Sequence, residues 1–287
     1  MIFMYIQTND FDKNNKERIY NLLVLKGEAL QKGELLRIQQ NVKDNEPYKN
    51  FFTTISLQID PLLIYFINDE ISASLHERGP LRDLIKEVKR DHSKDEHLNR
   101  LQAAEEDLPD LFANRTTFII GSSLLDFKVN TFSVFEFYIN ELYDLLLKTK
   151  PRSAQKEKDL LKLIDKYSKS NSEEEKLVLL SKIKKISFYV SSSEKIEYVL
   201  SRSGMEKKEM DEARIFLNFY RDSRNTIHNL GIHHGENKSV TVGSIEINLK
   251  NGGPSYTENY NSAFYACRKL MDIYESIYNG ITGKTVL

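Results

Sequence analysis

The sequence contains a single cysteine, no tryptophan, and only 12 glycines and 6 prolines among its 287 residues. With one cysteine, Cys267, the chain cannot form an internal disulfide, which is typical of proteins from a reducing compartment. Long uninterrupted apolar runs are absent too, since the longest candidate covers only residues 61–67. These absences predict a soluble, cytoplasmic protein without a membrane segment.

An excess of one charge is also missing, because 41 basic residues oppose 42 acidic ones. Any site for a polyanion must therefore be a local patch. The densest basic stretch covers residues 148–169, and it can be an RNA footprint or simply a solvated surface. The footprint that we consider consists of Lys148, Lys150, Arg152, Lys156 and Lys158.

The scarcity of glycine and proline and the wealth of Leu, Lys, Glu and Ile predict an all-α protein. Helical patterns cover residues 13–41, 51–75, 82–107, 129–147, 157–167, 172–188, a short stretch after Ser193, 207–229 and 258–278. Ser172 before three glutamates is a helix start signal, and Gly231 is a C-cap signal. We expect a helical N-terminal region of unknown role at residues 1–115 and a second domain at residues 116–287.

One segment departs from the helical period. Apolar and polar residues alternate from Val240 to Leu249, and residues 251–254, NGGP, form a strong turn cluster. This pattern predicts a small β-hairpin inserted before the last helix.

The most informative stretch is residues 220–231, YRDSRNTIHNLG, at the end of a predicted helix. Spacings of three, four and seven place Arg221, Arg224 and His228 on one side of an α-helix, with Asp222 and Asn225 on the wetter side. Guanidinium groups match phosphate oxygens, and an imidazole moves protons near neutral pH. The trio suits phosphodiester chemistry, although arginines that cap carbonyls and a histidine before a glycine cap can also be structural.

A second helix carries a carboxylate in its apolar face. Within the predicted helix at residues 129–147, Glu136 lies in the apolar face, and Asn140 lies beside it. A carboxylate in that position is unfavourable unless it has a cationic partner. We expect that Glu136 or Asn140 approaches Arg221 or Arg224 and orients it, or that Glu136 reaches past the edge of the helix to water.

These residues resemble the HEPN superfamily, whose helical bundles carry an arginine separated from a histidine by four to six residues near the end of a late helix. Arg221 and His228 enclose six residues, and a polar residue follows the arginine, as in that family. The Arg224-Asn225 pair also resembles the family's Arg-Asn pairing, with a gap to His228 that is one residue shorter. The resemblance covers residues 116–279 and leaves open which arginine has the motif role. It implies a C-terminal bundle of four to five helices.

Many HEPN proteins are metal-independent ribonucleases with a composite cleft between two subunits. The resemblance therefore implies that His228 acts as general base or acid on the RNA 2′-hydroxyl and that Arg221, helped by Arg224, stabilises the transition-state charge. It also implies a homodimer without metal or cofactor, and an antitoxin or a partner protein from an anti-phage defence system. Two alternatives remain: a non-catalytic HEPN-like module that binds a nucleotide or a protein, and an unrelated helical scaffold.

Overall fold

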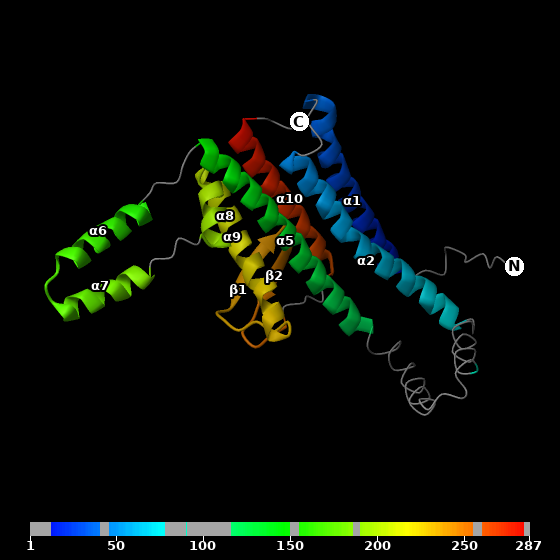
Figure 1. The fold of residues 1–287 in the computed structure, drawn as a ribbon. Helices are drawn as coiled ribbons and strands as arrows, with labels where there is room; N and C mark the ends of the chain where they lie inside the picture. Colours follow the sequence, from blue (N-terminus) through cyan, green and yellow to red (C-terminus); the bar gives the residue numbers. More distant parts are fainter. Residues whose placement is uncertain are drawn as a thin grey trace. The chain divides into compact units, whose positions relative to one another are not determined.

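The computed structural model describes residues 13–40, 46–77, 90, 116–149, 155–185, 190–254 and 260–283. In these ranges the protein is predominantly α-helical, with a single two-stranded hairpin (Figure 1), which confirms the predicted all-α class with a hairpin insertion. The predicted helix at residues 82–107 lies outside the described residues apart from Arg90. The elements are α1 (Lys13–Gln40), α2 (Pro47–Glu77), α5 (Thr116–Thr149), α6 (Gln155–Lys169), α7 (Glu173–Lys185), α8 (Ser192–Leu200), α9 (Lys207–Asn225), the 3-10 turn η3 (Thr226–Asn229), β1 (Lys238–Val242), β2 (Ile245–Leu249) and α10 (Tyr260–Thr282).

The helix starts follow local sequence signals. Pro47 is the first residue of α2. An N–H group at that position has no partner within the helix, so a proline, which has no N–H, is well tolerated there. Before α7, the Ser172 hydroxyl accepts a hydrogen bond from the Glu175 amide at 3.3 Å, as the start signal predicted. Helix α8 begins with a capping box between Ser191 and Glu194. Local capping therefore sets several helix boundaries.

The chain packs into two compact units. The first contains α1, α2, α5 up to Phe135, α9 from Asp211, the hairpin, and α10 up to Glu275; the second contains residues 136–210 and 276–285. Helices α1 and α2 thus share a core with α5 and α10. Residues 78–115, apart from Arg90, lie outside the described part of the chain. The predicted domain boundary between residues 115 and 116 therefore stays a prediction.

Aromatic residues from three helices form the core of the first unit. Phe51 of α2 stacks on Tyr274 of α10, with ring centroids 3.8 Å apart. Phe135 of α5 meets the edges of both rings, at 6.5 Å and 6.3 Å. All three side chains are fully buried. Truncating one such ring to alanine typically costs about 3–5 kcal/mol, so this cluster is a main source of stability.

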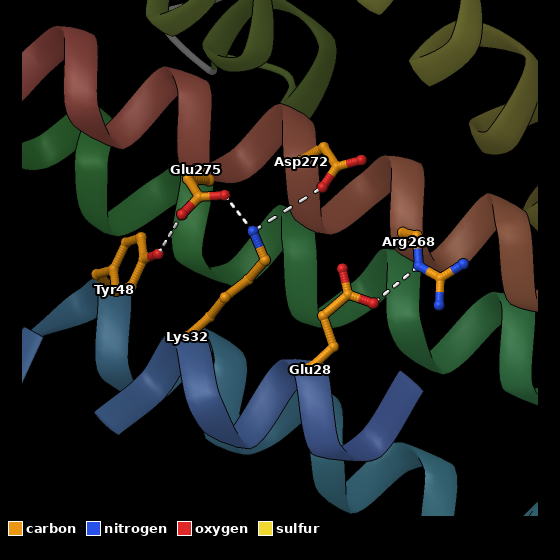
Figure 2. Close-up of polar contacts among 6 residues, drawn as sticks. All are labelled: Glu28, Lys32, Tyr48, Arg268, Asp272 and Glu275. Carbon is orange, nitrogen blue, oxygen red and sulfur yellow. Dashed lines mark hydrogen bonds and ion pairs between the residues drawn. The ribbon is translucent and has the colours of Figure 1, made fainter. Parts of the chain in front are cut away.

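A polar network joins α1 and α2 to α10 alongside that core. It consists of Glu28 and Lys32 on α1, Tyr48 on α2, and Arg268, Asp272 and Glu275 on α10 (Figure 2). Lys32 pairs with Glu275, whose other carboxylate oxygen accepts a hydrogen bond from the Tyr48 hydroxyl at 2.7 Å. Because each partly buried charge has an opposite partner, the network fixes the register of α1 on α10 without an isolated charge.

Helix α9 runs antiparallel to the first part of α5, and this arrangement positions the candidate site. The Tyr220 ring stacks on Phe132, with centroids 5.4 Å apart, and its hydroxyl lies 3.0 Å from the Thr131 hydroxyl. Eleven residues after Tyr220 in the chain, a Cβ placed on Gly231 would lie 3.4 Å from a Leu125 methyl group. The segment after Tyr220 therefore runs beside residues 125–131 of α5.

Aromatic side chains also contact one another in the second unit. The rings of Tyr143 on α5 and Tyr198 on α8 meet edge to face at 5.1 Å, and the Lys195 ammonium lies 5.5 Å from the Tyr143 ring centroid. Near the end of α10, Gly280 packs so closely on the Ser203 carbonyl that a side chain there would overlap it. Backbone contact at Gly280 therefore fixes the end of α10 in this unit.

Among the described helices, one segment, Pro47–Asp69 of α2, is long and apolar enough to cross a membrane by length and composition. The sequence prediction missed it because it considered uninterrupted apolar runs only. One such helix is weak evidence, since core helices of soluble proteins pass the same test. Its Phe51 and Phe66 are buried in the unit, and its Asp60 pairs with Lys26 of α1. The cytoplasmic location stays a prediction.

Candidate anion site at the end of helix α9

The helix that carries the motif changes type before the motif ends. The α-helix stops at Asn225, and Thr226–Asn229 form the 3-10 turn η3, whereas the sequence predicted one α-helix to residue 229. The Thr226 hydroxyl donates to the Ser223 carbonyl at 2.6 Å and so satisfies an acceptor at the transition. Gly231, at φ 79°, ends the segment and donates its N–H to the Thr226 carbonyl at 2.9 Å, as the C-cap signal predicted.

The change of helix type falls within the motif, between Arg224 and His228. A 3-10 helix turns about 120° per residue and an α-helix about 100°, so the backbone of η3 departs from the α-helical register that the sequence predicted. The His228 side chain itself lies outside the described residues, and its approach to the arginines stays a prediction.

The two arginines of the motif lie on the last turns of α9 and are half-buried. Asp222 lies between two cations: one carboxylate oxygen is 3.7 Å from Arg221 Nε, and the other pairs with Lys238 of β1. Arg224 donates from Nη1 to the Asn225 side-chain oxygen at 3.2 Å. The hairpin thus brings a cation, Lys238, that the motif analysis did not consider.

Lys128 is the functional candidate that the sequence analysis missed. It lies on α5 between Leu125 and Thr131, at the level of the α9 segment that follows Tyr220, and only 4% of its surface is exposed. Burial lowers the pKa of its ammonium group from 10.5 to about 8. Position 128 lies one helical turn from the buried Leu124 and Phe132, and this spacing was the sequence signal that Lys128 shares their buried face.

The predicted supporting residues on α5 belong to the second unit. Glu136 accepts a hydrogen bond from the hydroxyl of Ser192, the first residue of α8, at 2.8 Å. This contact explains how a half-buried carboxylate is stabilised within that unit. Asn140 is half-buried on the same helix. The expected approach of either residue to Arg221 or Arg224 stays a prediction.

Only part of the predicted RNA footprint lies in the described chain. Lys148 in the last turn of α5 and Lys158 on α6 are exposed. Lys150 and Arg152 lie outside the described residues, and Lys156 is described only as part of the α6 backbone. The footprint therefore stays a prediction.

Two other residues of reactive types, both in the first unit, are buried. Cys267 is fully buried, and burial raises the pKa of its thiol. His233 is also buried, and its Nε2 lies 3.0 Å from the Glu236 carbonyl oxygen. Within the described residues, no group of three or more His, Cys, Asp or Glu side chains could hold a metal ion.

Comparison of the chain with models of protein families, with curated proteins and with solved structures found no match. Function is therefore inferred from the residues of the site.

Proposed function

We propose that this protein is a metal-independent endoribonuclease of HEPN type, with a helical bundle that carries the motif at the end of α9. The observation that carries the proposal is the gathering of cations there. Arg221 and Arg224 lie half-buried on the last turns of α9, and Lys238 of β1 reaches the same turns through its ion pair with Asp222. The buried Lys128 lies on the part of α5 that runs beside the segment after Tyr220. Cations in a partly buried position are less screened than those on an open surface, which favours binding of a phosphodiester.

In the proposed reaction, His228 removes the proton from an RNA 2′-hydroxyl, and the 2′-oxygen attacks the adjacent phosphorus. Arg221, helped by Arg224, stabilises the negative charge on the pentacoordinate phosphorus. The bond from phosphorus to the 5′-oxygen then breaks, and that oxygen takes up a proton from a general acid. The products are a 2′,3′-cyclic phosphate and a 5′-hydroxyl. The same proposal includes a homodimer with a composite cleft and action in a toxin–antitoxin or anti-phage defence system. It also includes an antitoxin or a defence protein as partner.

The test is cleavage of RNA by the purified protein in EDTA, with detection of the cyclic phosphate at the new 3′ end. We expect His228→Ala and Arg221→Ala each to lower the rate about 100-fold or more. Arg214→Ala is the matched control, because Arg214 lies on the same helix and pairs with Asp211 away from the motif. Cleavage that survives both motif substitutions, or that is lost equally in the control, would refute the assignment.

One observation favours the second candidate, a non-catalytic module that binds a nucleotide or a protein. Arg221, Arg224 and Lys238 lie at or beside the last turns of α9, and cations alone suffice to bind a phosphate group. For this candidate, intact RNA at high protein concentration is expected. A labelled oligonucleotide should then bind with equal affinity to the wild type and to His228→Ala, and more weakly to Arg224→Ala.

A further inference from the structure

Helices α6 and α7 form an antiparallel hairpin (Figure 1). The turn between them is fixed locally, because the Ser170 hydroxyl donates to the Glu175 carboxylate at 2.7 Å and Ser172 caps α7. Ion pairs within each helix, Lys169 with Asp165 and Lys176 with Glu173, stabilise its two sides. The hairpin is therefore a defined local structure.

This hairpin buries little of its apolar surface. Leu179 is the only buried residue of α7, while Leu177 and Val178 beside it are 68% and 49% exposed. On α6, Leu161 and Ile164 are exposed as well. Two packed helices cover one face of each other, so a second apolar face remains open to another surface.

The charges on α7 indicate what covers that face. Its first turn carries three acids, Glu173, Glu174 and Glu175, and its last turn carries three bases, Lys182, Lys184 and Lys185. On the exposed side, Leu177, Val178, Ser181 and Lys185 follow Glu174 by three, four, seven and eleven residues, so they share one side of the helix and the stripe is acidic, then apolar, then basic. The stripe is complementary to itself only when two copies run antiparallel, because each acidic end then meets a basic end.

We propose that the α6–α7 hairpin is a homodimer interface. A second copy of the chain docks through a two-fold axis that passes near the middle of α7, and the two hairpins form an antiparallel four-helix bundle. A two-fold axis brings the same patch of both copies together, and the stripe is self-complementary under that operation. This inference names the contact of the homodimer that the proposed function includes. The cleavage test with the His228 and Arg221 variants is separate, so either proposal can fail without the other.

The apolar part of the stripe is tested with the double variant Leu177→Asp/Val178→Asp. Both side chains are exposed in the isolated chain, so the substitutions leave its fold intact and act on the interface. Sedimentation analysis should give the mass of a dimer for the wild type at micromolar concentrations and a dissociation constant at least about 10-fold higher for the variant. Ile215→Asp on α9 is the control, because Ile215 is 60% exposed and lies outside the hairpin.

Charge reversal tests the antiparallel arrangement. The basic variant, Glu174→Lys, and the acidic variant, Lys185→Glu, should each be monomeric alone and should form a heterodimer when mixed. Both substitutions in one chain should restore the homodimer, which rules out unfolding as the cause of the losses in the single variants.

A monomeric wild type at about 100 μM would overturn the proposal. A dimer that neither the aspartate substitutions nor charge reversal weakens would also overturn it, because the contact would then lie elsewhere. Binding of the hairpin to lipid vesicles by a chain that stays monomeric would assign the apolar face to a membrane surface instead, and would overturn it as well.

Discussion

Replacing Lys128 by methionine should stabilise the protein at neutral pH. Burial lowers the pKa of Lys128 from 10.5 to about 8, which means that the folded state holds the charged form less well than the unfolded chain does. A pKa difference of about 2.5 corresponds to about 3 kcal/mol, at about 1.4 kcal/mol per pH unit. Methionine has similar length and no charge, so it keeps the packing and removes this penalty.

The sign of the effect depends on pH in a defined way. Below about pH 8 the amine is protonated in both states, so the whole penalty acts on the wild type. Between about pH 8 and 10.5 only the unfolded chain holds the proton, so the stability of the wild type rises with pH relative to the variant. The gain from methionine should therefore fall from about 3 kcal/mol at pH 7 to about 1 kcal/mol at pH 10.

Urea unfolding of both proteins at these two pH values measures the difference. Lys148→Met is the control, since Lys148 is exposed near the other end of the same helix and its replacement should change stability by less than about 0.5 kcal/mol. A Lys128→Met protein that is less stable than the wild type, or a gain that does not change with pH, would refute the reasoning. Either result would mean that the ammonium group is held by favourable contacts and not penalised by burial.

Two further predictions concern packing. Gly280→Ala should destabilise the protein by more than about 2 kcal/mol in thermal or urea unfolding, because the methyl group would overlap the Ser203 carbonyl, whereas Gly27→Ala should stabilise it by about 0.5–1 kcal/mol because its surroundings are open. Tyr220→Phe should cost about 1 kcal/mol through loss of the 3.0 Å hydrogen bond to Thr131, and a double-mutant cycle should show this cost vanish in a Thr131→Val background. Equal effects at the two glycines, or additive effects at the hydroxyl pair, would contradict the packing described here.

The helices were predictable from the sequence because their signals are local. The cap at Ser172 and the glycine at 231 mark ends that the structure confirms, and the alternation from Val240 predicts the hairpin. Boundaries were less predictable where tertiary contacts decide them. Helix α5 begins at Thr116, well before the predicted residue 129, and its Leu124 is buried in the first unit. The sequence also gives no local signal that α1 and α2 share a core with α10.

The candidate site was predictable only in part, and the reason is helix geometry. Arg221 and Arg224 could be placed together because an α-helix fixes their spacing. The change to a 3-10 turn at Thr226–Asn229 could not be predicted, because it depends on packing around Thr226. Lys128 was missed because a lysine in an apolar stripe is usually taken to extend past the edge to water.

Lys128 and Lys32 show how the same residue type serves two purposes in one unit. Lys32 lies between carboxylates of α10 and is explained by the fold that it joins. For Lys128, burial dominates and lowers the pKa of the ammonium group, so the charge weakens the fold at neutral pH. An anion bound close to that ammonium group would offset the penalty, because a nearby negative charge favours the protonated amine. Anion binding near Lys128 should therefore stabilise the protein at neutral pH, and the free energy that burial of the charge costs would be recovered on binding.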